Sequence, residues 1–338
     1  MPLTLKDIAD MVGVAESTVS RAINDKPGVS KEKKEEILKI AKKHNYKPNQ
    51  LAQGLAKQQT HIIALLLSDL DNPSYTEIIK NIEEIANQAG YQVILCNTDN
   101  DLEKEKSYFE LIKRNIVDGA IIVGGELADK KVLNVALKKE APIVLVNRLS
   151  EELLIPTILI DNTRGGYLAT SHLIKQGLNR IAVIMGSKKD FLESKKLDGY
   201  YQALTEFNIN PENNLIIETN STRQDGYNAF LKLMELQEPP QGFFVTKDLL
   251  AVGLVDAIKM GGYLIPNDFP IVGYGESLIS SVINPSLTVV SEPLAKLGKL
   301  SAQYLIKLMR DDSLSETINV LEPVIKVRES SIPQFNNK

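Results

Sequence analysis

The 338-residue chain contains one cysteine, three histidines and no tryptophan. The lone Cys96 excludes an intramolecular disulfide and a cysteine-rich metal site, and its place at the end of an apolar run predicts a buried side chain. The longest apolar run near the start, Ile62 to Leu67, is far too short to cross a membrane. The remaining composition is that of an ordinary globular protein without low-complexity tracts.

The common motifs of α/β enzymes are also missing. The chain has no Gly-x-Ser-x-Gly, no Walker A sequence and no Gly-x-Gly-x-x-Gly, and its histidines, His44, His61 and His172, stand in no catalytic motif. We therefore expect a protein that is not an enzyme and has no catalytic residue, cofactor or metal. No secretion signal precedes the first predicted helix, so a cytoplasmic protein is expected.

The length fits two or three domains, and the charge is unevenly spread along them. Residues 1–60 carry 11 Lys and Arg against 7 Asp and Glu, a net charge of +4, which leaves −8 for the rest of the chain. A basic head on an acidic body is typical of a DNA-binding tip. For the run from Lys31 to Glu36, a solvated helix surface is an equally simple interpretation.

The first residues predict two short helices separated by a tight turn. Apolar side chains at i, i+3, i+4 and i+7 define one helix face: Leu5, Ile8, Ala9 and Val12. Thr4 can cap this helix and Gly13 breaks it. A second helix then turns Val19, Ala22 and Ile23 inward. This pattern predicts a helix-turn-helix, whose second helix enters the major groove of DNA.

A third helix, capped by Ser30, precedes the segment from Tyr46 to Lys57. At this point the chain resembles the LacI/GalR family of bacterial repressors. The segment Val14 to Asn24 is similar to the family's recognition helix, and Tyr46 to Ala52 is similar to the entry of its hinge helix. Further similar segments follow in order, so the resemblance covers nearly the whole chain: Asp71-Asn72-Pro73-Ser74-Tyr75, Val117-Asp118-Gly119, Ile160-Asp161-Asn162, Lys196-Leu197-Asp198-Gly199-Tyr200, Ile265-Pro266, Val272-Gly273-Tyr274 and Pro285-Ser286-Leu287-Thr288.

The resemblance implies that Glu16 and Ser17 set most of the base preference. A bidentate contact from Arg21 to a guanine would contribute about 1–3 kcal/mol of discrimination. Two interpretations of Glu16 stay open, acceptance from a cytosine amino group and a favourable charge at a helix N-terminus. The residues expected at the DNA are Thr4, Leu5, Ala15, Glu16, Ser17, Thr18, Ser20, Arg21, Asn24, Asn49, Ala52 and Leu55.

Leu55 carries the most specific of these expectations. In the family, a pair of hinge helices enters the minor groove and a leucine wedges between the central base pairs, at an unstacking cost of a few kcal/mol. Gly54 lowers helicity by about 1 kcal/mol relative to alanine, so we expect residues 49–57 to become helical only on DNA. The alternative is a linker leucine packed on the body.

From residue 61 onward, apolar strands alternate with helical patterns, which predicts parallel sheets covered by helices on both faces. Strands are expected at 62–67, 91–96, 119–123, 143–146, 180–184, 242–245 and 271–273, and helices near 75–89, 103–114, 130–139, 164–176, 193–207, 222–236 and 247–260.

The resemblance implies a two-lobed body like that of periplasmic sugar-binding proteins. The expected domains are a helix-turn-helix at 1–47, a hinge at 48–60 and an effector-binding and dimerisation domain at 61–338. Lobe 1 spans about 61–161 and 290–322, and lobe 2 about 162–289 and 323–338. The short polar C-terminus lacks the leucine heptads of a tetramerising tail, so a homodimer is expected.

The resemblance places an effector cleft between the lobes, lined by Ser74, Tyr75, Arg148, Asp161, Lys196, Lys247 and Glu276. Here the chain departs from the sugar-binding pattern. Lys196 stands where arginine is usual, Lys247 replaces a neutral amide, and Gly275 replaces a ligand-binding carboxylate. These changes predict a cleft biased toward positive charge and an anionic effector, such as a sugar phosphate or sugar acid.

The sequence thus predicts a homodimeric regulator, most simply a repressor of a carbohydrate-related operon. Its expected partners are palindromic operator DNA and a small-molecule effector, with no membrane. Two alternatives stay open: control by a protein co-repressor such as phosphorylated HPr, and a solute-binding protein, which the helix-turn-helix disfavours.

Overall fold

The structure, a computed structural model, describes residues 4–44, 46, 59–70, 72–125, 142–148 and 154–332. The chain divides into two compact units, Met1–Thr60 and His61–Lys338, which we call the head and the body. Each unit has its own apolar core. None of the helices in the described ranges is both long and apolar enough to span a membrane.

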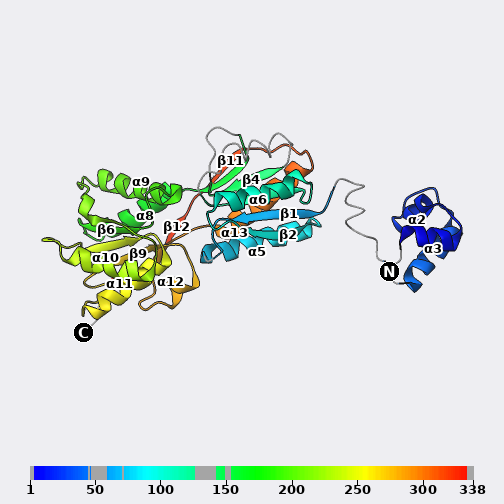
Figure 1. The fold of residues 1–338 in the computed structure, drawn as a ribbon. Coiled ribbons are helices and arrows are strands. Elements are labelled where there is room, and N and C mark those ends of the chain that lie inside the picture. Colours follow the sequence, from blue (N-terminus) through cyan, green and yellow to red (C-terminus); the bar gives the residue numbers. More distant parts are fainter. Residues whose placement is uncertain are drawn as a thin grey trace. The chain divides into compact units, whose positions relative to one another are not determined.

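The head consists of α1 (Leu5–Val12), α2 (Glu16–Ile23) and α3 (Lys31–Lys43) (Figure 1). Thr4 and Asp7 form a reciprocal capping box at the start of α1, and Gly13 ends that helix with φ 67°. Ser30 caps α3 by accepting a hydrogen bond from Lys33 N. The three helices enclose one small core, formed by Ile8, Ala9, Val12, Val19, Ala22, Ile37 and Ala41.

The first lobe of the body is built on a six-stranded parallel sheet of order β11-β5-β4-β3-β1-β2. Its strands are β1 (Ile62–Leu67), β2 (Gln92–Asn97), β3 (Gly119–Val123), β4 (Ile143–Val146), β5 (Thr157–Ile160) and β11 (Ile318–Leu321). Helices α5 (Pro73–Gln88) and α13 (Leu294–Met309) pack on one face, and α6 (Leu102–Lys113) packs on the other. Because alternate residues of β1 face opposite helix layers, the strand is apolar along its whole length.

The second lobe repeats this plan with the sheet order β12-β10-β9-β8-β6-β7, in which only β12 is antiparallel among the strands described. Helices α8 and α9 pack on one face, and α10 and α11 on the other. The elements are α8 (Asn162–Ile174), β6 (Ile181–Met185), α9 (Phe191–Glu206), η1 (Asn213–Leu215), β7 (Ile216–Glu218), α10 (Arg223–Met234), β8 (Gly242–Val245), α11 (Asp248–Met260), β9 (Ile271–Tyr274), α12 (Leu278–Val282), β10 (Thr288–Ser291) and β12 (Val324–Lys326).

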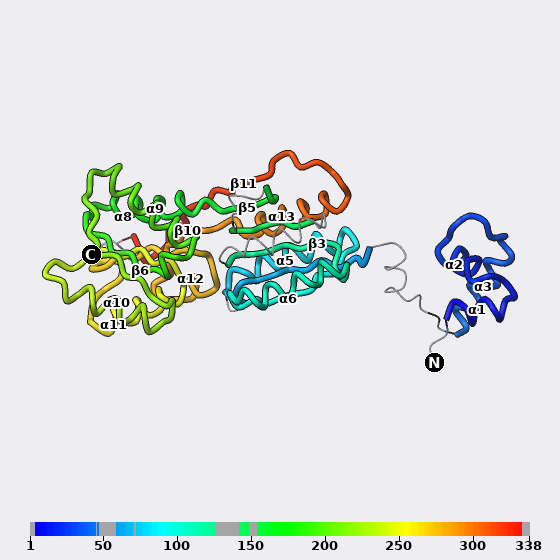
Figure 2. The backbone as a smooth tube through the Cα atoms, turned by 45° about the horizontal axis from the view of Figure 1, so that its top comes forward, coloured from blue at the N-terminus to red at the C-terminus, as the bar shows by residue number. Residues whose placement is uncertain are grey.

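The chain crosses between the lobes three times, after β5, after β10 and after β11. Figure 2 shows the late orange and red segments returning to the first lobe as α13 and β11 before ending in the second. The sequence predicts this return from about residue 290, but Val290 and Ser291 belong to β10 in the second sheet. That boundary is therefore corrected to follow Ser291, because the pairing of β10 with β9 decides its sheet.

The predicted fold class is confirmed, with a three-helix head and parallel sheets covered on both faces. The strands β5, β7, β10 and β11 are absent from the prediction. Gly90 and Gly177 follow α5 and α8 with φ 84° and 91°, the left-handed conformation in which glycine commonly ends a helix. Cys96 is buried, and burial raises the pKa of its thiol to about 11. The predicted hinge at 49–57 and helix at 130–139 lie outside the described residues.

Candidate functional site

In the head, α2 buries Val19 and Ala22 and leaves its opposite side open to solvent. The exposed residues on that side are Ala15, Glu16, Ser17 and Arg21, and the partly exposed ones are Thr18, Ser20 and Asn24. Ala15 is the N-cap and provides no side-chain hydrogen bond, so the first N–H groups of α2 lack a side-chain acceptor there. A polar helix face of this kind can reach base edges and phosphates.

Three of the predicted DNA-contacting residues also make contacts that stabilise the head. The Thr4 hydroxyl takes part in the capping box with Asp7, and Leu5 packs against the core. Asn24 donates its amide to Ser20 O at 2.9 Å, at the end of α2. Asn49, Ala52 and Leu55 lie outside the described residues.

The body contains a cavity of about 310 Å³ between its lobes. Asn72, Ser74 and Tyr75 line it from the start of α5, and Asn147 lines it from the end of β4. The second lobe contributes the start of α9, the junction of β8 and α11, and Tyr274 at the end of β9. Most of these side chains follow the carboxyl ends of parallel strands, where open α/β sheets bind ligands. The volume suits a ligand the size of a monosaccharide.

A buried ion pair forms part of the cavity wall. Lys196 Nζ donates to Glu193 Oε1 at 2.8 Å, and both side chains are more than nine-tenths buried. Glu193 also accepts hydrogen bonds from Gly186 N, at 2.9 Å, and from the Thr246 hydroxyl. Lys196 Nζ lies 4.2 Å from the centre of the Tyr274 ring. Partners on several sides therefore hold the Lys196 ammonium in place.

These contacts decide the protonation of the pair. Burial alone would lower the pKa of Lys196, but the carboxylates of Glu193 and Glu292 outweigh it and raise that pKa above its ordinary value. Burial would likewise raise the pKa of Glu193, but Lys196 and Lys247 outweigh it and lower that pKa. Both groups are therefore charged in the folded body.

Two further carboxyl groups in the wall are compensated less completely, although a hydrogen bond from Ser277 and the charge of Lys196 act on Asp248. Burial raises the pKa of Asp248, and its Oδ1 atom is buried without a hydrogen-bond partner in the part of the chain that the structure describes. Burial also raises the pKa of Glu292, against the effect of Lys196 and with repulsion from Asp248. Glu292 lies where the chain leaves β10 for α13, at a crossing between the lobes.

The predicted positive bias of the cleft is wrong. Among the described residues, the wall contains five carboxylates, Asp69, Asp190, Glu193, Asp248 and Glu292, against two ammonium groups, Lys196 and Lys247. Gly275 provides no carboxylate at a position where the resemblance implies one. Asp190 and Asp248 at helix starts and Glu292 at a lobe crossing supply acidic groups instead. The described wall therefore has no excess of cations that would favour an anionic effector.

Four of the seven predicted effector residues line the cavity: Ser74, Tyr75, Lys196 and Lys247. Burial raises the pKa of Tyr75 to about 12, and its hydroxyl is 2.6 Å from Ser68 Oγ.

The other three predicted residues are absent from the described wall and have partners elsewhere. Arg148 is buried against Glu105, with its Nη2 3.1 Å from Oε1. Asp161 caps α8 by accepting from Arg164 N at 2.8 Å. Glu276 accepts from Arg328 Nη2 at 2.9 Å and pairs with Lys326.

Sequence reasoning missed Asn147, Asp190, Glu193, Asp248, Tyr274 and Glu292 as cavity residues. Most of them follow a predicted strand or begin a predicted helix, so the rule that ligands bind at the carboxyl ends of strands could have found them. Glu292 had no such signal, because it lies at a crossing between lobes.

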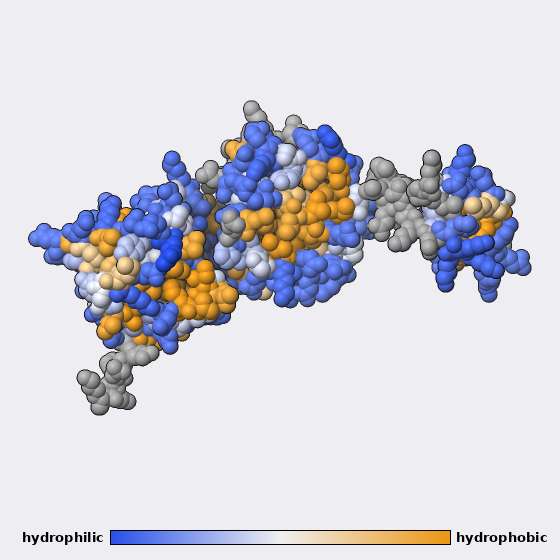
Figure 3. All heavy atoms as spheres, turned by 60° about the horizontal axis from the view of Figure 1, so that its bottom comes forward, coloured by the Kyte–Doolittle hydropathy of each residue, from blue (hydrophilic) through white to orange (hydrophobic). Residues whose placement is uncertain are grey.

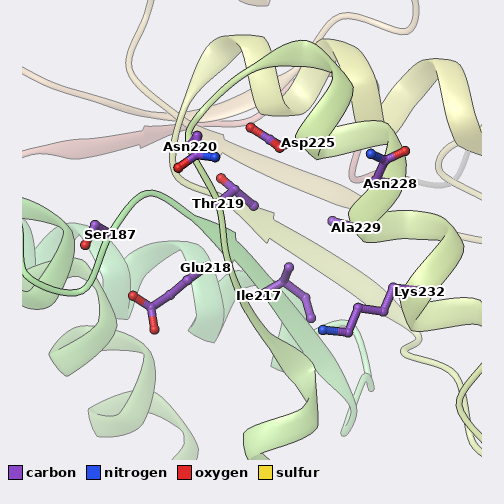
Figure 4. Close-up of a pocket in the computed structure, with 9 residues that line it drawn as sticks. All are labelled: Ser187, Ile217, Glu218, Thr219, Asn220, Asp225, Asn228, Ala229 and Lys232. Carbon is purple, nitrogen blue, oxygen red and sulfur yellow. The ribbon is translucent and has the colours of Figure 1, made fainter.

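A second hollow, about 430 Å³, opens beside β7 and α10 in the second lobe (Figure 4). Its acidic groups already have partners: Asp225 forms a capping box with Thr222, and Glu218 accepts from Lys188 N at 2.8 Å. We assign it no ligand. No group of three or more potential ligand side chains in the described ranges could hold a metal ion.

Comparisons with known proteins cover both units. A family model of bacterial regulatory proteins of the lacI family matches residues 4–49. A model of periplasmic binding proteins and the sugar binding domain of the LacI family matches residues 60–325. The HTH-type transcriptional regulator RegA of Clostridium saccharobutylicum is 33% identical over 334 residues, which are 98% of this chain and 100% of that protein.

Two solved structures extend the similarity to three dimensions. The lac repressor dimer bound to operator and the anti-inducer ONPF matches with a TM-score of 0.86 and 25% identity, covering 98% of this chain and 100% of that one. A LacI family regulator from Enterococcus faecium with bound ribose matches with a TM-score of 0.71 and 29% identity, covering 80% and 99% of the two chains.

Proposed function

Because the chain belongs to the LacI family of bacterial regulatory proteins, we propose that it is a dimeric repressor that a small polar molecule controls through the interlobe cavity. As a member of this family it is a DNA-binding transcriptional regulator and not an enzyme. The proposed targets are a two-fold symmetric operator and a carbohydrate-related operon.

The observation that carries this proposal is that one chain has both an exposed polar face on α2 and a cavity at the carboxyl ends of both body sheets. Glu16, Ser17 and Arg21 are placed to read bases, with Ser20 and Thr18 beside them. A ligand that contacts both lobes would favour one arrangement of the lobes over another, and only such a difference in affinity can shift an equilibrium.

Exposed apolar side chains on the body support a dimer. The side chains of Met260, Leu278 and Val282 are 76%, 77% and 69% exposed in the single chain. Figure 3 shows apolar surface on both lobes of the body. Exposed apolar surface of this kind is often buried in an interface between subunits.

Selection of binding sites from random double-stranded DNA tests the proposal. We expect a site with two-fold symmetry, bound by two chains as measured by light scattering of the complex. Recovery of no enriched sequence, or of an asymmetric site bound by one chain, would contradict the assignment.

A further inference from the structure

The cavity holds more negative charge than its own cations balance. Of the two ammonium groups in the wall, Lys196 is already paired with Glu193 at 2.8 Å. One ammonium group, Lys247, therefore remains in the described wall beside the carboxyl groups of Asp190, Asp248 and Glu292. Asp190 already uses Oδ1 to accept from Leu192 N at 2.8 Å as it caps α9. Two acceptors in the described wall remain without a donor. They are Oδ1 of Asp248, whose carboxyl group otherwise bonds to Ser277, and the carboxylate of Glu292.

Asp248 and Glu292 come from different parts of the fold but line the same cavity. Asp248 begins α11 in the second lobe, and Glu292 lies at the crossing toward α13. Oδ1 of Asp248 is buried without a hydrogen-bond partner in the described structure, and the described residues that shift the pKa of Glu292 act on it through charge and not through a hydrogen bond. Each group's negative charge disfavours ionisation of the other, as the raised pKa of Glu292 reflects.

Neutral polar groups are abundant in the same wall. Asn72, Ser74, Asn147, Ser221 and Thr246 supply donors and acceptors that suit the hydroxyl groups of a ligand. A neutral ligand would find enough partners among these groups, and it would leave Glu292 and the free Oδ1 of Asp248 buried without a donor, which is costly. An anionic ligand would add to their repulsion. A cationic group on the ligand would offset that cost through charge-assisted hydrogen bonds.

We infer that the cavity binds a small polyhydroxylated amine, with its protonated amino group held between Asp248 and Glu292. The amino sugars are the ligand class that fits both the charge and the volume of about 310 Å³. This inference rests on the proposed role of the cavity as the effector site. It makes Lys196 a positioning residue that holds Glu193 and Tyr274, and not the partner of a ligand anion.

Calorimetric titration of the full chain with matched compounds tests the inference. The probes are D-glucosamine and D-galactosamine, their uncharged N-acetyl derivatives, and the parent sugars D-glucose and D-galactose. We expect at least one amine to bind at least about tenfold more tightly than both of its uncharged counterparts. Equal or tighter binding of an uncharged counterpart, or no binding of either amine at millimolar concentration, overturns the inference.

Two isosteric variants test whether Asp248 and Glu292 bind the amino group of the ligand. Glu292→Gln and Asp248→Asn should each weaken binding of the preferred amine at least about tenfold, because one partner of a buried charge pair is lost. They should also reduce its advantage over the parent sugar. Glu83→Gln, at an exposed position on α5, is the matched control. Unchanged amine preference in both cavity variants, with melting curves that show folded protein, overturns the inference.

Operator binding separates this inference from the proposed function. A protein that selects a symmetric operator but prefers uncharged sugars is still a repressor with a different effector. A protein that binds the amine but selects no DNA site refutes the repressor proposal and leaves the ligand class standing.

Discussion

At the residue scale, the buried pair of Glu193 and Lys196 dominates the electrostatics of the cavity wall. Taking two charges out of water is costly, and their mutual attraction together with the bonds from Gly186 N and Thr246 offsets that cost. Such a pair contributes little compared with a well-packed apolar pair. Removing only one of the two residues strongly lowers the free energy of unfolding, because the other charge then stays buried without a partner.

Lys196→Met should therefore lower the free energy of unfolding by about 3–5 kcal/mol. The matched control is the double variant Glu193→Gln with Lys196→Met, which should recover a large part of the loss since no charge is left unpaired. Urea denaturation of the three proteins measures the difference. A single variant as stable as wild type would mean that the lysine is not the partner that keeps Glu193 ionised.

The raised pKa of Glu292 predicts how the stability of the folded body changes with pH. An unfolded chain releases this proton near the ordinary pKa of 4.5, whereas the folded body retains it to higher pH. The folded state then binds more protons, so the contribution of this group to stability falls as pH rises from about 4.5 through the raised pKa. Lys196, Lys247, Glu193 and Asp248 are the charged groups that set the size of this effect.

Glu292→Gln removes the titrating group. As pH rises through that range, the melting temperature of the variant should therefore increase relative to that of the wild type. Thermal melts of both proteins at matched ionic strength provide the comparison. A difference between them that does not change with pH would contradict the assignment of a raised pKa to Glu292.

Arg21 provides a test of base reading. It is exposed on α2, and a bidentate contact to guanine contributes about 1–3 kcal/mol of discrimination. Arg21→Ala should lose affinity for the selected operator and lose its preference at one base pair of each half-site. Binding assays with single base-pair substitutions measure this. An equal loss on every DNA sequence would instead indicate a phosphate contact.

At the element scale, glycine allows two helix pairs of the second lobe to approach backbone to backbone. A Cβ on Gly199 of α9 would lie 2.0 Å from Thr163 O of α8, and one on Gly253 of α11 would lie 1.8 Å from Arg223 O of α10. No rotamer change relieves a clash with a main-chain oxygen. The helices would have to separate, and the α8–α9 pair carries Lys196 into the cavity wall.

Gly199→Ala should therefore destabilise the body by about 3 kcal/mol, at the upper end of ordinary overpacking. Gly261→Ala is the control, because that glycine has φ −73° and its Cβ would first meet the side chain of Tyr263 at 3.0 Å. Chemical denaturation should show a small change for the control only. Similar stability of both variants would contradict close packing of α8 on α9.

The long elements of this fold could be predicted from the sequence, and several short strands could not. The apolar run of β1 and the helical spacing of α5 are local signals, and both elements appear within a few residues of prediction. β7 and β5 have three and four residues and are absent from the prediction. Because β4, β8 and β9 also have four residues and are predicted, strand length alone does not decide. The assignment of Val290 to a sheet depends on its partner Tyr274, which only the folded chain brings near.

The same division holds for the candidate site. Lys196 could be placed in the cavity from its sequence frame, but its partner Glu193 and the unpaired Glu292 could not. Arg148 and Glu276 lie outside the described wall, where their charges are satisfied by Glu105 and Arg328, which are 43 and 52 positions away in the chain. Charge balance in a cavity is a property of the assembled lobes, and a count along the sequence does not report it.

At the scale of the whole molecule, opposite net charges on the head and the body affect DNA binding. Residues 1–60 carry +4 and the remainder carries −8, so attraction to phosphate is concentrated in the head. Operator affinity should fall about 10³–10⁵-fold between about 50 and 200 mM salt if a dimer makes 6–10 phosphate contacts. Fluorescence anisotropy across a salt series measures the slope. Affinity independent of salt would exclude binding through this basic head.

The late strands β11 and β12 have a consequence for the synthesis of the protein. The head is complete once its first sixty residues have left the ribosome, but each body sheet receives its last strand only from residues 318–326. Until then β5 and β10 present unpaired edges, which readily recruit strands from other chains. A nascent chain truncated before Ile318 would thus combine a finished head with two open-edged lobes. Residues 318–326 therefore decide whether a newly made chain becomes a regulator or a target for chaperones and proteases.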